Sequence, residues 1–277
     1  MEQTADSSSG GENLRALEEN LWTMWRMFGM GHGCSLHEDD EVTYFDTPIR
    51  TLPYNGVIRS RLREETAEQR IDAIFKHYHD RGMPFFWIVH PTSTPADLGK
   101  RLETRGFSEA ESCPGMTMEL ADLPEITEET TPGIQIREAV TKDDLNAIYE
   151  LIAWRWEVPP EIKPLLPEVT NQFPVGESEG PLRCWIAWHM GVPVSKVVLN
   201  LGAGVAGIYG VATKPEVRGL GLARKMTVMA FHEARRLGYT KGVLHSTEMA
   251  QSLYEKIGFK DCQAPFRVFC EGDNFHI

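Results

Sequence analysis

A short turn with two glycines, placed between an apolar strand and an amphipathic helix, constrains the fold of this chain more than any other feature. Residues 205–213 are apolar and predict a buried strand, and residues 219–237 show helical apolar spacing that ends at Gly238. The turn between them reads Arg218-Gly219-Leu220-Gly221. Strand, tight turn and helix in this order are typical of a mixed α/β fold.

The same turn has the composition of an anion site. Gly219 and Gly221 carry no side chains, so successive backbone N–H groups can approach a ligand, and the helix N-terminus adds partial positive charge. Arg218 supplies a full positive charge, and Ala223 is small enough to admit a phosphate. We therefore predict a pyrophosphate site. A tight turn without a ligand or a site for another nucleotide is the alternative, although the P-loop Gly-Lys-Ser/Thr and the third Rossmann glycine are missing.

The segment resembles the acetyl-CoA motif of the GNAT acyltransferase superfamily, Arg/Gln-x-x-Gly-x-Gly/Ala at the start of a helix. The preceding strand ends in Gly-Val-Ala-Thr, as in that family, and about thirty residues after Ala223 the chain reads Ser252-Leu-Tyr254-Glu-Lys-Ile-Gly258-Phe259. The resemblance covers residues 134–277. It implies that acetyl-CoA is the co-substrate, with its pantetheine arm paired to the backbone of Val211 and Thr213 like an added strand. The implied binding residues are Val211, Ala212, Thr213, Arg218, Gly219, Leu220, Gly221, Leu222, Ala223 and Arg224.

The resemblance also suggests the catalytic groups. Tyr254 is the candidate general acid, because a phenol hydroxyl can stabilise or protonate a departing CoA thiolate. The alternative for Tyr254 is an aromatic that only packs. Many GNAT enzymes carry a glutamate on the strand before the turn, but residues 205–212 contain no carboxylate. His245 and Glu248 are the nearest candidate bases, and a water relayed by Ser246 or a side chain from the first half are alternatives.

Residues 123–133 are polar, acidic and rich in proline, which predicts a linker. Residues 1–132 hold 12 basic and 24 acidic side chains, so the net charge of −12 lies entirely before residue 133. We expect a disordered tail at 1–12, one domain at 13–122 and a second at 134–277. The first domain looks like an eroded copy of the second, with Arg63-Glu64-Glu65-Thr66 at the turn and Leu102 in place of the tyrosine. An unrelated α/β domain is the alternative.

The resemblance and the element pattern together predict an α/β fold of two tandem GNAT-like domains. Each domain is expected to be a mixed, mostly antiparallel sheet flanked by helices. In the second domain, residues 266–270 are expected to form the strand that closes the sheet. In the first, residues 14–28 are expected to form the first helix, and strands are expected at 54–61 and 85–90 around a helix at 68–81.

The composition of the chain argues against several classes of binding partner. The negative charge disfavours nucleic acid, and the longest apolar stretch, residues 197–213, is interrupted by glycines and does not predict a membrane helix. The five cysteines form no C-x-x-C pair and are expected to be buried thiols in a cytoplasmic protein. His77 and His79 would point in different directions on a helix and lack ligand partners nearby in sequence, so no metal is predicted. The oligomeric state stays open.

These expectations favour an enzyme that transfers an acetyl group from acetyl-CoA directly to the amine of a small-molecule metabolite or antibiotic. Direct transfer is expected because no cysteine has a recognisable nucleophile setting. A non-catalytic acyl-CoA sensor or scaffold is the alternative from another class, favoured by the missing strand glutamate. Acyl transfer to a hydroxyl or thiol is a third hypothesis. The acidic first half favours a cationic acceptor, and a solvated acidic face that keeps the protein soluble is the alternative reading of the same charge.

Overall fold

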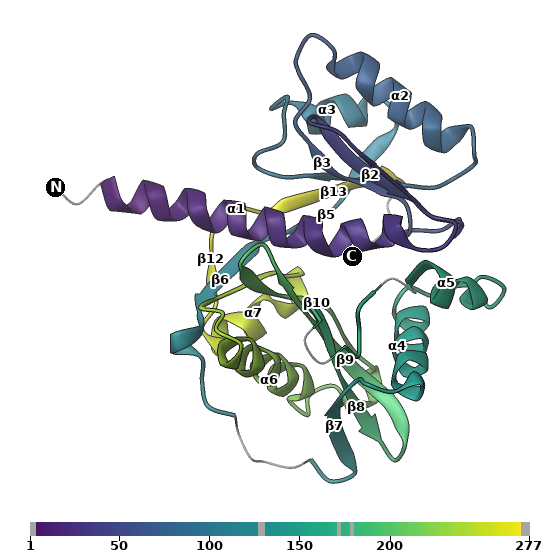
Figure 1. Cartoon of the computed structure of the whole chain (residues 1–277). Coiled ribbons are helices and arrows are strands. Elements are labelled where there is room, and N and C mark those ends of the chain that lie inside the picture. The colour runs from purple at the N-terminus through teal and green to yellow at the C-terminus, as the bar shows by residue number, and fades with distance from the viewer. Residues whose placement is uncertain (1–3, 127–130, 171–172, 178–179, 273–277) are drawn as a thin grey trace. The chain divides into compact units, whose positions relative to one another are not determined.

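The structure is a computed structural model that describes residues 4–126, 131–170, 173–177 and 180–272. It contains two mixed sheets flanked by helices (Figure 1), which confirms the expected α/β class. The chain forms two compact units that are not contiguous in sequence. Unit 1 comprises Met1–Met24, Gly115–Pro159 and Phe173–Gln263, and unit 2 comprises Trp25–Pro114, Pro160–Gln172 and Ala264–Ile277.

Unit 1 is built on a sheet of seven strands in the order β12-β6-β11-β10-β9-β8-β7. Strands β10 and β11 are parallel and the other neighbours are antiparallel. The strands span Gly115–Glu119 (β6), Ile134–Glu138 (β7), Leu182–His189 (β8), Val192–Gly202 (β9), Val205–Thr213 (β10), Lys241–His245 (β11) and Lys260–Asp261 (β12). Strands β8 and β9 are consecutive antiparallel neighbours and form a hairpin.

Helices cover both faces of this sheet, with α6 (Leu222–Arg236) and α7 (Glu248–Ile257) on one face and α4 (Lys142–Arg155) on the other (Figure 1). Helix α4 begins with a capping box formed by Thr141 and Asp144. The core between α6 and the sheet includes Ile208, Met226 and Phe231, all nearly inaccessible to solvent. Short 3-10 turns span η2 (Leu120–Asp122) and η4 (Pro215–Val217).

The N-terminal helix α1 (Thr4–Arg26) corrects two expectations. Residues 4–12, expected to be a disordered tail, are helical, because a helix formed by the apolar residues that follow extends at little cost. Residues 1–3 lie outside the described residues. The helix was also expected to belong to the first domain, but up to Met24 it belongs to unit 1. Its buried Asn20 donates hydrogen bonds to the carbonyls of Gly202 at 2.8 Å and Val205 at 3.2 Å, and accepts one from the Tyr209 hydroxyl at 2.8 Å.

Unit 2 is built on a sheet of six strands in the order β1-β2-β3-β4-β13-β5. Helices α2 (Ala67–His79) and α3 (Leu98–Glu103) lie on one side of it (Figure 1), around a core that includes Ile71, Trp87 and Leu102. The remaining short helices are η1 (Met27–Met30), η3 (Lys163–Leu165) and α5 (Leu166–Thr170). The strands span Ser35–Glu38 (β1), Val42–Asp46 (β2), Gly56–Ser60 (β3), Phe86–Val89 (β4), Phe107–Cys113 (β5) and Phe266–Glu271 (β13).

The two units exchange strands, which corrects the expectation that residues 266–270 close the C-terminal sheet. Strand β13 instead lies between β4 and β5 of unit 2, and β6 lies between β11 and β12 of unit 1. The linker at 123–133 therefore connects β6 and β7 within unit 1 and does not separate the units; its residues 127–130 lie outside the described part. Each exchanged strand satisfies backbone groups on both of its edges, and the local pattern of a strand does not specify the sheet that it joins.

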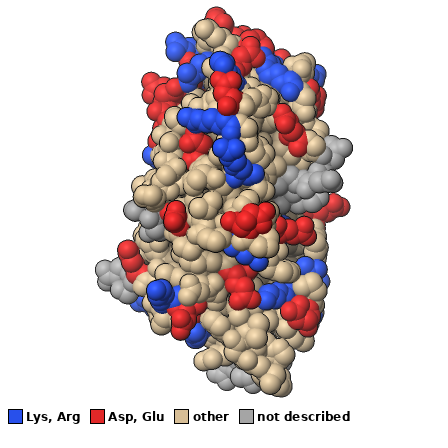
Figure 2. Space-filling model, turned by 90° about the vertical axis from the view of Figure 1, so that its right-hand side faces the viewer, with Lys and Arg blue, Asp and Glu red and all other residues tan. Residues whose placement is uncertain are grey.

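The cysteines, the helices and the surface charge were also subjects of the sequence predictions. All five cysteines are thiols, three of them buried. None of the described helices has both the length and the apolar character needed to cross a membrane. On the face drawn in Figure 2, acidic and basic side chains lie interspersed over the surface.

Candidate functional site

The glycine turn between β10 and α6 has the backbone conformation that only glycine adopts easily. Gly219 has φ 78° and Gly221, the N-cap residue of α6, has φ 72°, both in the left-handed region. A Cβ atom placed on either glycine would meet no other atom within 4 Å, so the space in front of the turn is open. No side chain caps this end of α6. The backbone N–H groups of the first helical turn therefore remain available to an anion.

Arg218 connects this turn to the end of β10. Its exposed guanidinium donates a hydrogen bond from Nε to the Thr213 carbonyl at 3.1 Å. Leu222 is buried in the core and anchors the first turn of α6, while Ala223 and Arg224 are half-buried beside it. A positive charge, a helix N-terminus and an open glycine turn thus lie next to one another.

The pairing of β10 with β11 ends before β10 reaches the turn. The pairing of β10 with β11 runs from Ala206 with Gly242 to Ile208 with Leu244. Strand β10 continues to Thr213, and in this last stretch its paired neighbour among the described strands is β9. The β11 side of residues 209–213 is therefore a strand edge without a ladder partner in the described part of the chain. Such an edge can pair with an extended ligand.

A bulge shapes this edge. The register of β10 against β9 shifts between Tyr209 and Ala212, and Gly210 within the shift has φ 53°. The Nζ atom of Lys196, a residue only 5% exposed, donates a hydrogen bond to the Gly210 carbonyl at 2.6 Å. Burial lowers the pKa of Lys196 below its ordinary value. Lys196 was not among the residues predicted from sequence, where its signal is a lysine inside a mostly apolar strand.

Tyr254 lies on α7 in the same core cluster as Leu222 and Leu244. Only 5% of its surface is exposed, and its ring lies 6.2 Å from that of Phe259. Burial raises the pKa of Tyr254 well above its ordinary value. The phenol therefore stays protonated at neutral pH, which is the form that a proton donor requires.

The candidate bases lie at the junction of β11 and α7. His245 is the last residue of β11 and is half-buried, and Glu248 is the first residue of α7 and is exposed. The hydroxyl of buried Ser246 donates a hydrogen bond to the Thr247 carbonyl at 2.8 Å, so its proton is already engaged. His245 and Glu248 both lie close in sequence to the end of β11, the strand parallel to β10. The geometry does not favour one of them over the other as the base.

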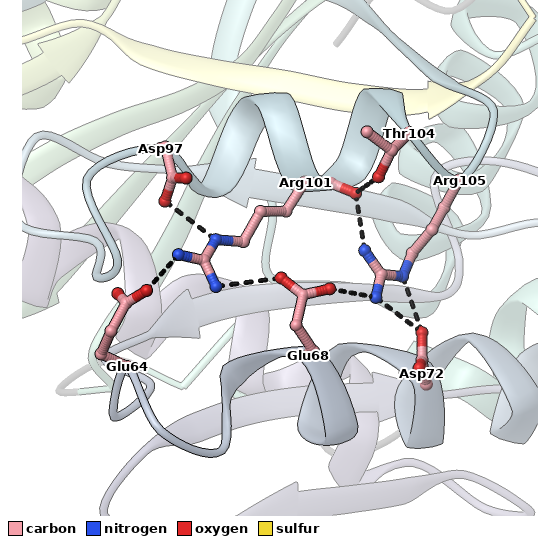
Figure 3. A network of polar contacts seen from close by, with 7 residues as sticks. All are labelled: Glu64, Glu68, Asp72, Asp97, Arg101, Thr104 and Arg105. Atoms are coloured by element: carbon pink, nitrogen blue, oxygen red, sulfur yellow. Dashed lines mark hydrogen bonds and ion pairs between the residues drawn. The ribbon is translucent and has the colours of Figure 1, made fainter.

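The corresponding turn of unit 2 contains a network of ion pairs (Figure 3). Arg101 on α3 binds Glu64, and it also contacts Glu68 at 2.9 Å. Arg105 contacts the other oxygen of Glu68 at 2.6 Å and Asp72 at 2.7 Å. Carboxylates therefore line the beginning of α2, where an anionic ligand would be repelled. Leu102 is fully buried and offers no hydroxyl.

Known proteins resemble this chain in sequence over one segment and in fold over most of its length. Residues 145–259 match the model of the acetyltransferase (GNAT) family. A search of curated proteins finds no match. Among solved structures, a GCN5-related N-acetyltransferase from Kribbella flavida is similar with a TM-score of 0.67 and 14% identity, over 92% of this chain and 95% of that chain. A tandem GNAT protein from the clavulanic acid biosynthesis pathway has a TM-score of 0.60 and 11% identity, over 98% and 97% of the two chains.

A third similar structure, a GCN5-related N-acetyltransferase from Sphaerobacter thermophilus, has a TM-score of 0.56 and 17% identity, over 87% of this chain and 84% of that chain. These identities establish a shared fold, and the family match adds acyl transfer as the general reaction class. Residues 145–259 therefore match the acetyltransferase (GNAT) family, and the chain as a whole shares its fold with solved GNAT structures, a tandem GNAT protein among them.

Proposed function

We propose that the C-terminal part of unit 1, which holds β10, α6, β11 and α7, binds acetyl-CoA and transfers its acetyl group directly to the amine of a small molecule. The observation that supports this proposal is that a free strand edge runs directly into an anion-binding turn. An unpaired edge of β10, residues 209–213, leads directly to an open glycine turn at the N-terminus of α6. An extended arm that ends in a pyrophosphate fits this sequence of a strand edge followed by an anion site.

The residues present fit acetyl-CoA. The backbone of Val211 and Thr213 would pair with the pantetheine arm, and residues 218–224 would hold the pyrophosphate through backbone N–H groups and the Arg218 charge. When bound, acetyl-CoA supplies a thioester carbon open to nucleophilic attack and a thiol leaving group. The Cβ of any larger residue at Gly219 or Gly221 would enter the open space that the phosphates need.

Tyr254 is the proposed general acid because its buried phenol stays protonated at neutral pH. The base is proposed to be His245 or Glu248, the titratable groups at the β11–α7 junction. The described cysteines support direct transfer, because burial raises the pKa of Cys184, the thiol on β8, to about 12 and keeps it protonated.

The acceptor is proposed to be a small cationic or amine-bearing molecule. The excess of negative charge lies wholly in residues 1–132 and would raise the local concentration of a cation near the protein. A non-catalytic acyl-CoA sensor is a second candidate, favoured by the absence of a carboxylate on β10. Transfer to a hydroxyl or thiol is a variant of the first proposal.

Calorimetric titration with acetyl-CoA tests the binding site. Arg218→Glu and Gly221→Glu place a carboxylate against the pyrophosphate, and each is expected to weaken binding by about 2–4 kcal/mol. Lys260→Glu is the matched control, since Lys260 is an exposed cation on β12, away from the turn in sequence. Equal affinity in all four proteins would contradict the proposed site.

Turnover distinguishes the enzyme from the sensor. Release of CoA thiol is measured with a panel of small amines, alcohols and thiols, and amines are expected to give rates above background hydrolysis. A protein that binds acetyl-CoA but releases thiol only at the background rate with every acceptor is a sensor. A covalent acetyl-enzyme trapped by rapid quench would contradict direct transfer.

A further inference from the structure

Unit 2 brings together three side chains that are distant in sequence, His37 on β1, Asp46 on β2 and His77 on α2. One possible ligand atom from each lies within 4.8 Å of the others. The Nε2 atom of His77 is 2.5 Å from Oδ1 of Asp46, and the Nε2 atom of His37 is 3.4 Å from the same oxygen. The cluster is far in sequence from the proposed acetyl-CoA site and includes none of its residues.

The fold holds these three side chains on one surface. In the β1–β2 pairing, Ser35 lies opposite Asp46 and His37 opposite Tyr44, so His37 and Asp46 emerge on the same face of the hairpin. The His37 ring stacks on the Tyr44 ring at 4.4 Å. Helix α2 is fixed against β2 by a hydrogen bond from the Tyr78 hydroxyl to the Phe45 carbonyl at 2.7 Å, next to His77. The arrangement is therefore built by packed elements.

Two imidazoles and one carboxylate form a ligand set that suits Zn²⁺. The distance from Zn²⁺ to a nitrogen or oxygen ligand is about 2.0–2.2 Å. In a tetrahedral site, two neighbouring ligand atoms therefore lie roughly 3.3 Å apart. The 3.4 Å between His37 and Asp46 already has this length, and the 2.5 Å between His77 and Asp46 needs a small expansion. The Nε2 atom of His37 is buried and makes no hydrogen bond within the described residues, so this nitrogen is available.

A cation already occupies the space between two of the three groups. One nitrogen of Arg81, Nη1, lies 2.5 Å from Oδ1 of Asp46 and 2.6 Å from Nε2 of His77. The Arg81 side chain is 51% exposed, so it can turn into solvent without disturbing the core. The site therefore attracts positive charge, and the guanidinium and a metal ion would compete for the same two atoms.

We propose that His37, Asp46 and His77 bind a divalent transition-metal ion, Zn²⁺ by preference, with one coordination position left for water. This replaces the expectation from sequence that the chain has no metal site. That expectation rested on His77 and His79, and the structure separates them: His79 contacts Glu271 at 2.9 Å instead. The bound ion would join the β1–β2 hairpin to α2 and stabilise unit 2.

Equilibrium dialysis of the untagged full-length protein with Zn²⁺ tests the proposal, together with the visible absorption of the Co²⁺-loaded protein. One equivalent of Zn²⁺ is expected to bind. Asp46→Asn and His77→Asn are expected to lower the affinity by about 100-fold or more, because an asparagine at 77 is too short to reach the ion. His79→Asn, on the same helix but outside the cluster, is the matched control and should keep the wild-type affinity.

Arg81→Gln gives a test that leaves all three ligands in place. Removing the competing cation is expected to raise Zn²⁺ affinity by about threefold or more. If Asp46 and His77 serve only to hold the Arg81 guanidinium, Arg81→Gln should lower the stability of unit 2 and leave Zn²⁺ affinity unchanged. The proposal is overturned if wild-type protein binds no Zn²⁺, if Asp46→Asn and His77→Asn bind it as the wild type does, or if Arg81→Gln binds it no more tightly.

Discussion

The Nζ atom of Lys196 donates a hydrogen bond to the carbonyl of Gly210 at 2.6 Å, and this contact fixes the bulge of β10. The bulge lies within the strand edge that leads to the glycine turn. A Cβ on Gly210 would come within 2.8 Å of the same Nζ atom, so the lysine and the glycine depend on each other. The buried Nζ group of Lys196 satisfies a carbonyl that the shifted register removes from the β9 ladder.

Lys196→Met is expected to lower acetyl-CoA affinity about tenfold, because the bulge loses a buried hydrogen bond that holds its shape. Calorimetric titration measures the affinity, and circular dichroism checks that the variant is folded. Lys260→Met, an exposed lysine of unit 1, is the control and should bind acetyl-CoA normally. Unchanged affinity in Lys196→Met would mean that the bulge does not contribute to binding.

Tyr254→Phe is expected to leave acetyl-CoA binding nearly intact and to reduce turnover by about 100-fold or more, as removal of a general acid does. The ring remains to fill the same buried space, so stability should change little. Steady-state kinetics across pH and a binding titration separate the two effects. Tyr239→Phe, at a half-buried tyrosine that follows α6, is the control. Normal turnover in Tyr254→Phe would remove this residue from the acid role.

The ion-pair network of unit 2 is expected to serve stability and not CoA binding. Glu64→Gln and Glu65→Gln should leave acetyl-CoA affinity unchanged. Arg101→Met should lower the Tm, since Arg101 contacts Glu64, Glu68 and Asp97 together. The loss should shrink in about 1 M salt, where exposed ion pairs are screened. A gain of CoA affinity in Glu64→Gln would instead indicate a second CoA site.

Glu233 is expected to make stability depend on acid pH. Hydrogen bonds from Arg236 and then Arg183 lower the pKa of this carboxyl from 4.5 to about 2 in the folded protein. Its stabilising contribution is therefore complete above pH 4.5 and is lost as the pH falls towards 2. The free energy of unfolding of the wild type should fall more steeply over this range than that of Glu233→Gln. Glu216→Gln, an exposed carboxyl in η4, should retain the wild-type slope.

The kcat/KM for a cationic acceptor is expected to fall as salt rises from about 0.01 M to about 0.5 M, because screening removes long-range attraction to the acidic first half. The reason is the net charge of −12, which lies before residue 133. A neutral amine of similar size provides the comparison and should be nearly insensitive to salt. A best acceptor with net negative charge would contradict this electrostatic argument and leave acetyl-CoA binding unaffected.

The local elements of the candidate site could be predicted from the amino-acid sequence alone. A positive φ at Gly219 and Gly221 follows from a tight turn between a strand and a helix, and the capping of α4 by Thr141 follows from residue type. These features depend on interactions among neighbours in the chain, which a sequence pattern records directly. The family of the second half could be identified for the same reason, since its motif is contiguous.

The assignment of each strand to its sheet could not be predicted from sequence and depends on long-range contacts. Strands β6 and β13 have ordinary local patterns, and their exchange between units depends on which sheet offers them free backbone groups on both sides. The assignment of α1 to unit 1 depends on contacts of Asn20 with residues about 180 positions away. The contact of Lys196 with the β10 bulge, and that of His77 with Asp46, likewise join residues that local periodicity cannot relate. Such contacts arise from packing of whole elements, whose geometry is set by the complete core.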